Sequence, residues 1–112
     1  MSIIRVGNEL VINTEQRVVH LNGTQLNLPD LTYRLLLSLI EHAPEIVTKD
    51  TLEREVWSGR PVSEETIKQR VARLRAALGE TAASPKYFVA VRGTGYRCIA
   101  QVSGNPPRNP YQ

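Results

Sequence analysis

The pattern of hydrophobic and polar positions changes from strand-like to helical after the first 28 residues. Before that point, four short runs are β-branched or alternate between apolar and polar side chains, and turn-forming residues separate them: Ile3–Val6, Leu10–Ile12, Arg17–Leu21 and Gln25–Leu28. Asn22-Gly23, between the last two runs, favours a tight hairpin because both central residues of such a turn adopt positive φ. The pattern predicts a small antiparallel sheet.

Helical spacing then appears in three segments. The stretch from Asp30 to His42 places leucine and isoleucine side chains on one stripe, and Ala43-Pro44 ends it. Thr48 is a suitable N-cap for a second helix, which has three apolar side chains on one face: Leu52, Val56 and Trp57. Ser63 is expected to cap a third helix that ends near Leu78-Gly79, since glycine can adopt the left-handed capping conformation.

The last part of the chain returns to strand-like sequence and then loses periodicity. Tyr87–Val91 and Tyr96–Ala100 are expected to pair as a hairpin across the turn formed by Arg92-Gly93-Thr94-Gly95. The residues from Ser103 onward contain three prolines and have no periodicity. We therefore predict one α+β domain over residues 1–101 and a proline-containing tail, or the start of a linker, over residues 102–112.

Composition excludes several classes of protein. A chain of 112 residues with 41% hydrophobic side chains can build one core without disulfides or metals. No apolar run approaches the roughly 18 residues of a membrane span, and no secretory signal is visible. The single cysteine, Cys98, cannot form an internal disulfide, which predicts a buried thiol in reducing cytosol.

Positive charge is concentrated in one part of the chain. Residues 1–62 hold six Lys/Arg and eight Asp/Glu, a net charge of −2, whereas residues 63–97 hold seven Lys/Arg and three Glu, a net charge of +4. The basic segment coincides with the predicted third helix and the hairpin. This distribution is typical of a protein with a polyanionic partner. For the helix taken alone, a solvated charged face is the better explanation of the charge.

The third helix has a face that suits a DNA groove. At about 100° per residue, four apolar side chains face the core: Ile67, Val71, Leu74 and Leu78. The opposite face carries small and polar side chains, with Glu65 beside them: Thr66, Gln69, Ala72, Arg73 and Ala76. The alanines keep this face slim, Arg73 can bond guanine and Gln69 can bond adenine. Three flanking side chains are better placed for phosphates: Arg70, Lys68 and Arg75.

The hairpin turn adds a second candidate contact. Two glycines keep the turn narrow, so that Arg92 could enter a minor groove, where the negative potential is strongest. Gly93-Thr94-Gly95 also fits an ordinary hairpin turn. A phosphate-binding loop is excluded because no Gly-Lys-Ser/Thr follows and the segment leads into a strand.

From Ile4 to Ile99 the sequence resembles the OmpR/PhoB-type winged-helix DNA-binding domains of bacterial transcriptional regulators. Four motifs in order carry the resemblance: Val47–Leu52 with Val56-Trp57, Val62–Ile67, Val71–Gly79 and Tyr87–Arg97. The resemblance implies a winged helix-turn-helix with an N-terminal four-stranded antiparallel sheet, three helices and a C-terminal β-hairpin wing. It also implies that the third helix (63–78) enters the major groove and the wing (91–96) the minor groove.

The family positions also imply roles for individual residues. Those expected at bases or phosphates in the major groove are Thr66, Gln69, Arg70 and Arg73, and Arg92 matches the minor-groove arginine. Three residues match positions that contact the DNA backbone: Trp57, Thr94 and Tyr96. Arg97 also lies at a position where the family meets DNA. The loop at 58–62 matches the segment that some members use to contact RNA polymerase, and members usually bind direct repeats as head-to-tail pairs. The chain departs from the family at Glu65, where many members have arginine, and at three further positions: Thr32, Ala72 and Ala77.

The domain arrangement leaves two interpretations open. Response regulators of this class carry a receiver domain before the winged helix, whereas this chain starts a few residues before the first strand. A winged helix followed by a proline-containing linker resembles the ToxR/CadC-type membrane-tethered regulators. This predicts a cytoplasmic domain of an inner-membrane-anchored protein, and the alternative is a piece of a longer regulator with an added methionine.

Other functional classes fit less well. His20 and His42 lie in different elements without a carboxylate or cysteine at metal-ligand spacing, and no paired-carboxylate site is apparent. We therefore expect no enzyme, cofactor, metal or small-molecule substrate. RNA is disfavoured because the major groove of A-form RNA is too deep and narrow for a helix. The remaining alternative is a winged helix that contacts only protein, which Glu65, Ala72 and Ala77 would favour. We expect sequence-specific binding of double-stranded promoter DNA.

Overall fold

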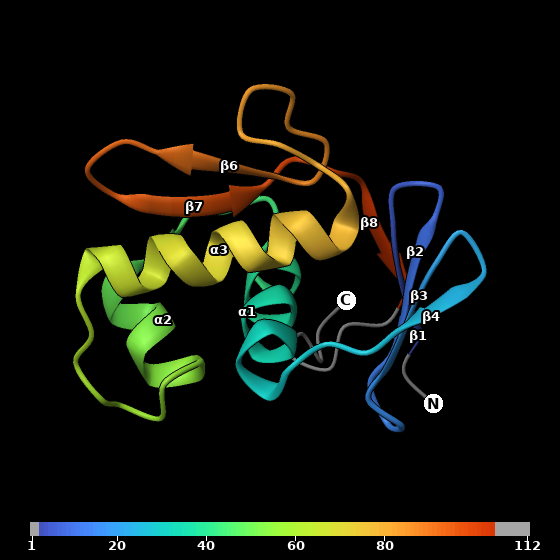
Figure 1. Ribbon diagram of the computed structural model, residues 1–112, viewed down its shortest axis with the longest axis horizontal. Coiled ribbons are helices and arrows are strands. Elements are labelled where there is room, and N and C mark those ends of the chain that lie inside the picture. The colour runs from blue at the N-terminus through green and yellow to red at the C-terminus, as the bar shows by residue number, and fades with distance from the viewer. Residues whose placement is uncertain (1–2, 105–112) are drawn as a thin grey trace.

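A five-stranded antiparallel sheet forms one end of the molecule in the computed structural model, which describes residues 3–104 (Figure 1). Its strands are β1 (Ile3–Val6), β2 (Leu10–Asn13), β3 (Val18–Leu21), β4 (Thr24–Leu26) and β8 (Val102–Gly104), in the order β4-β3-β2-β1-β8. The four predicted N-terminal strands are confirmed. The predicted third strand starts one residue later than expected because Arg17 has φ 56°, a left-handed conformation that belongs to a turn.

Strand β8 lies within the segment that we expected to be a tail. It pairs with β1 in the register Ile4↔Gly104, and the neighbouring Gly7 N–H donates to the Gln101 carbonyl at 2.8 Å. Gly104 is required there, because a Cβ atom would lie 2.2 Å from the Ile3 carbonyl oxygen and the backbone has φ 111°. The remaining part of the predicted tail, 105–112, lies outside the described residues.

Three helices follow the first four strands: α1 (Asp30–Glu41), α2 (Lys49–Glu55) and α3 (Glu64–Leu78). The predicted caps of α2 and α3 are confirmed. Thr48 Oγ1 accepts the Thr51 N–H at 3.3 Å, and Ser63 Oγ accepts the Thr66 N–H at 3.1 Å. Gly79 ends α3 with φ 75°, as expected for a glycine C-cap.

A second, three-stranded sheet contains the wing. Its order is β5-β7-β6, where β5 is Val47–Thr48, β6 is Phe88–Val91 and β7 is Gly95–Cys98. The short β5 was not predicted. Gly95 permits it, because a Cβ atom at this position would lie 2.0 Å from the Val47 carbonyl oxygen. The β6–β7 hairpin extends away from the five-stranded sheet, with α3 running alongside it (Figure 1).

One hydrophobic core joins both sheets to the helices. It combines apolar side chains from alternate positions of β1 and β2, the inner face of α1, the four inward positions of α3 and the start of β6. The largest fully buried side chains include Tyr87 and Phe88, which anchor the hairpin. The wing and α3 are therefore held on the same core, and their outer surfaces keep a defined relation to each other.

Candidate nucleic-acid interface

Helix α3 presents the two faces that its sequence predicts. The side chains of Ile67, Val71, Leu74 and Leu78 are buried in the core. The opposite positions are exposed: Thr66, Gln69, Ala72, Arg73 and Ala76. With two alanines on it, the exposed face has a narrow profile, and Gln69 and Arg73 are its long hydrogen-bonding side chains. This is a geometry that a major groove can accept.

Two of the predicted flanking cations differ in how firmly they are held. Arg70 is half-buried, and its Nη1 donates to the Thr32 hydroxyl of α1 at 3.2 Å. Thr32 is 1% exposed, so this bond fixes the Arg70 side chain across the α1–α3 contact. Lys68, on the other flank, is exposed.

Arg75 points inward, which corrects the expectation that it would contact phosphate. Its Nη2 donates to the Phe88 carbonyl at 3.1 Å, and its Nε lies 3.6 Å from Glu80 Oε2. The Arg75 side chain is only 14% exposed. The cause is that β6 lies beside the last turns of α3 and offers the Phe88 carbonyl to the guanidinium, while Glu80, just after α3, offers a carboxylate. Arg75 therefore ties α3 to the wing.

Glu80 is the partner that sequence reasoning missed. Its side chain is 1% exposed, and its Oε1 accepts the backbone N–H groups of Lys86 and Tyr87, both at 2.6 Å. In the sequence it appeared only as the first residue of a loop. No periodic pattern marks it, although an acidic residue directly after a glycine C-cap and shortly before an aromatic strand was the available signal.

The wing turn exposes the residues that were predicted to meet DNA. Arg92, Gly93 and Thr94 are exposed, and the Thr94 N–H closes the turn by donating to the Val91 carbonyl at 2.9 Å. Arg97 is also exposed on β7. Tyr96 is half-buried, and burial raises the pKa of its phenol, while nearby Arg75 acts in the opposite direction.

A groove of about 460 Å³ separates the N-terminal half of α3 from the wing. It is lined by Leu52 and Ile67 at its apolar part, by the turn residues from Ala90 to Tyr96, and by three charged side chains: Lys49, Glu64 and Lys68. Lys49 was not predicted as a site residue. It comes from the first turn of α2, and the fold brings it to the basic residues of α3 and the wing.

Trp57 and the loop at 58–62 lie at the junction of α2 and α3. Trp57 is partly buried and packs against the core. The loop is held by a bond from Arg34 Nη1 to the Ser58 hydroxyl at 3.2 Å and by the Val62 N–H, which donates to Glu53 Oε2 at 3.0 Å. The loop therefore has a fixed shape next to α3.

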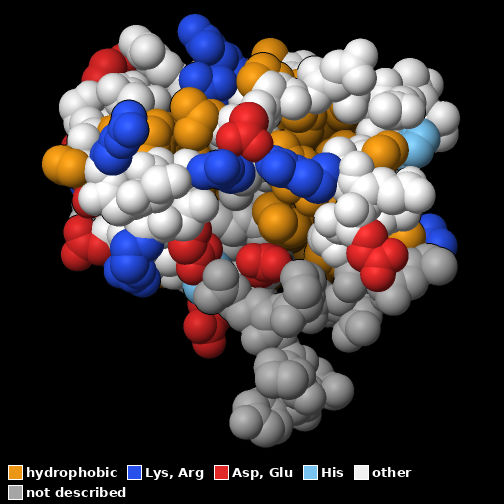
Figure 2. All heavy atoms as spheres, turned by 90° about the horizontal axis from the view of Figure 1, so that it is seen from below, with side chains coloured by type: hydrophobic (Ala, Val, Ile, Leu, Met, Phe, Trp, Pro, Cys, Tyr) orange, Lys and Arg blue, Asp and Glu red, His pale blue; other side chains and the backbone are white. Residues whose placement is uncertain are grey.

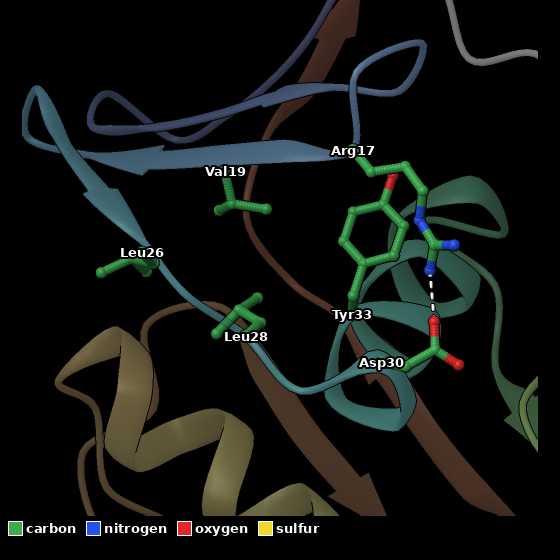
Figure 3. A pocket seen from close by; sticks show the side chains of 6 residues that line it. All are labelled: Arg17, Val19, Leu26, Leu28, Asp30 and Tyr33. Carbon is green, nitrogen blue, oxygen red and sulfur yellow. Dashed lines mark hydrogen bonds and ion pairs between the residues drawn. The ribbon is translucent and has the colours of Figure 1, made fainter.

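Other surfaces differ in character from the α3–wing surface. A hollow of about 210 Å³ lies between the five-stranded sheet and α1, and apolar side chains form its floor (Figure 3). At its edge, Arg17 donates a hydrogen bond to Asp30 at 2.5 Å. The Arg17 guanidinium also lies 4.7 Å from the centre of the Tyr33 ring. Figure 2, a view of the molecule from below Figure 1, shows Lys and Arg side chains next to Asp and Glu side chains with hydrophobic side chains between them. A face of mixed sign attracts a polyanion less than the exposed cations of α3 and the wing do.

The described part of the chain contains neither a metal-binding cluster nor a membrane-spanning helix. No group of three or more His, Cys, Asp or Glu side chains in residues 3–104 could hold a metal ion. No helix within the same range is both long and apolar enough to cross a bilayer.

Comparison with known proteins adds a family. The family model described as "Transcriptional regulatory protein, C terminal" matches residues 23–98. Sensory transduction protein RegX3 of Mycolicibacterium smegmatis is 33% identical over 87 residues, which are 77% of this chain and 38% of that protein. Regulatory protein VanR of Enterococcus faecium is 32% identical over 94 residues, 82% of this chain and 41% of that protein. The chain thus spans about two fifths of the length of these relatives.

Solved structures resemble the fold as a whole. The DNA-binding domain of Klebsiella pneumoniae RstA, solved in complex with the RstA box, has a TM-score of 0.77 and 26% identity, with 85% of this chain and 95% of that chain covered. The DNA-binding domain of Escherichia coli CadC has a TM-score of 0.78 and 27% identity, with 94% of this chain and 98% of that chain covered.

Proposed function

The chain belongs to the OmpR/PhoB-type winged-helix DNA-binding domains of transcriptional regulators, and we propose that it reads promoter DNA with α3 in the major groove and the wing in the adjacent minor groove. A domain of this family binds DNA in a sequence-specific manner and is not an enzyme. The observation that supports the proposed docking is the slim exposed face of α3 beside an exposed wing arginine, with both elements fixed on one core.

Each exposed side chain has a role that its chemistry supports. In the major groove, Arg73 would bond guanine O6 and N7, and Gln69 would bond adenine N6 and N7. Arg92 would enter the minor groove. The remaining residues would contact phosphates or the sugar-phosphate backbone: Thr66, Lys68, Arg70, Trp57, Thr94, Tyr96 and Arg97. Arg75 leaves this set because its guanidinium is engaged inside the domain.

The test is selection of bound sequences from a random duplex library at about 0.15 M salt. Enrichment of one half-site, repeated at helical-turn spacing, is the expected result. Binding without enrichment would refute base reading, and no binding would favour the alternative that this winged helix contacts only protein.

Arginine variants separate base contacts from general charge. We expect Arg73→Ala to weaken binding to the selected site by about 1–3 kcal/mol and to relax discrimination at one base position. The matched control is Arg5→Ala, which removes an exposed arginine from β1 in the other sheet. An equal loss on random and selected DNA would contradict the proposed role of Arg73. Arg92→Ala should chiefly reduce the preference for A/T-rich flanks.

The assembly on DNA is part of the same proposal. RstA and AdeR have been solved with an RstA box and an intercistronic region, respectively, which supports promoter DNA as the partner of this chain. We propose head-to-tail pairs on direct repeats and a contact of the ordered loop at 58–62 with RNA polymerase. Mobility shifts on probes with one and two half-sites would test the pairing on direct repeats. For the polymerase contact, Arg60→Ala should reduce transcription while DNA binding stays unchanged.

A membrane-tethered arrangement is the domain organisation that we favour. The likeness to CadC, in which almost the whole of that domain is matched, supports it. In this arrangement, the folded domain, which extends through β8 to Gly104, binds DNA in the cytoplasm, and the chain that follows starts the connection to a membrane segment. Fractionation of cells that express the complete gene product would show the regulator with the inner membrane, and recovery with the soluble fraction would contradict tethering.

A further inference from the structure

Glu65 places a carboxylate on the face of α3 that is proposed to enter the major groove. It lies in the first turn, one helical turn before Gln69 on the same side of the helix. Its side chain is exposed, and within residues 3–104 no hydrogen bond or ion pair engages its carboxylate. The exposed charged side chains that follow it on this face and its flank, Lys68 and Arg73, are positive, whereas Glu65 is negative.

The helix dipole alone does not account for the position of this acid. An acidic side chain in the first turn stabilises a helix wherever it points. Glu64 occupies the same turn and provides this effect while facing the groove between α3 and the wing. Glu65 adds a second charge on the outer face, where a phosphate would be repelled. A hydrogen-bond donor of the DNA that met this acid would offset the repulsion and make the position favourable for binding.

The major groove offers such a donor. A carboxylate accepts hydrogen bonds and donates none, and the base-edge group that pairs best with it is the N4 amino group of cytosine. We propose that Glu65 is a specificity residue that accepts a hydrogen bond from cytosine N4 in the half-site. This inference rests on the proposed docking of α3 and names one base that the docking would select.

The helix geometry predicts where the cytosine lies. Glu65 and Gln69 are four residues apart, a rise of about 6 Å along the helix axis. Successive bases are about 3.4 Å apart along a strand. The cytosine should therefore lie within about two base steps of the position that Gln69 reads, toward the DNA that faces the N-terminus of α3.

Two matched variants test the proposal. Glu65→Ala removes the acid from the outer face, and Glu64→Ala removes a first-turn acid from the groove, so both lose the same type of helix-dipole stabilisation. Library selection with the wild-type domain should enrich a cytosine in the half-site. In competition binding, Glu65→Ala should lower the preference for this cytosine over the other bases by about 5- to 100-fold. Glu64→Ala should keep the wild-type preference. Glu65→Ala should also bind random DNA more tightly, because a charge that repels phosphates is gone.

The outcomes separate this inference from the docking on which it rests. An enriched half-site that is identical for wild type and Glu65→Ala would overturn the role of Glu65 and leave the docking intact. If both variants lose the preference for cytosine equally, the effect belongs to the helix N-terminus. That result would also overturn the role of Glu65. A wild-type domain that enriches no half-site would overturn the docking itself. Circular dichroism melting of both variants checks that the fold is retained.

Discussion

Replacement of Glu80 by alanine is expected to destabilise the domain far more than its loop position suggests. The carboxylate is almost fully buried and is the acceptor for two backbone N–H groups at 2.6 Å. It is also the nearby negative charge for Arg75, whose side chain is 14% exposed. Truncation would leave the buried Tyr87 N–H group without its acceptor and the largely buried Arg75 guanidinium without its counter-charge.

The expected cost follows from these contacts. A hydrogen bond to a charged group contributes about 1.5–3 kcal/mol, and removal of one partner of a buried ion pair costs about 3–5 kcal/mol. Because these contributions overlap in one carboxylate, we expect a total of about 3–5 kcal/mol rather than their sum. For a domain of this size, that loss corresponds to a fall in Tm of roughly 10 to 20 °C.

Urea unfolding followed by circular dichroism measures this quantity. Glu45→Ala is the control, because Glu45 is exposed and its replacement should change the free energy of unfolding by less than about 0.5 kcal/mol. The double variant Arg75→Met with Glu80→Ala should lose less than the sum of the two single variants, since no unpaired charge is left buried. A loss below about 1 kcal/mol for Glu80→Ala, or strict additivity with Arg75→Met, would refute this account of the network.

Three further predictions concern the wing. Gly95→Ala should lower the free energy of unfolding by about 1–3 kcal/mol, because its Cβ would lie 2.0 Å from the Val47 carbonyl oxygen. An unchanged midpoint in urea unfolding would contradict this close approach. Cys98 is buried, and burial raises the pKa of its thiol, so its reaction with a disulfide reagent should be much slower in the folded domain than in urea. Equal rates would contradict its burial. Burial also raises the pKa of Tyr96, so its contribution to stability is complete below about pH 10 and is lost as the pH rises through the higher pKa of the folded state. Tyr96→Phe should therefore lose stability less steeply than wild type above that pH, and parallel curves would refute the shift.

The sequence predicted those elements whose signal is local. The cap at Ser63 and the glycine C-cap at Gly79 define α3 from within its own residues, and the three- and four-residue spacing of its apolar side chains determines which face is buried. For the same reason the exposed face, with Gln69 and Arg73, was predicted correctly.

Features that depend on contacts between distant segments were not predictable in this way. Arg75 falls on a flank of α3 by helical geometry, and only the neighbouring β6 turns it inward. Glu80 becomes buried because the backbone of Lys86 and Tyr87 returns to it. The two-residue β5 and the three-residue β8 are too short to show an alternating pattern.

The pairing of β8 with β1 has a mechanical consequence. Ile4 and Gly104 are partners in this register, so the two ends of the described domain leave from the same end of the neighbouring strands β1 and β8, at the opposite end of the molecule from the wing (Figure 1). Tension applied through chain attached at Gly104 would load the three-residue β8 first, and the core beneath α3 only after β8 had separated from β1. The domain could thus be pulled toward a surface or an attached partner while the geometry of its DNA-facing elements stays unchanged.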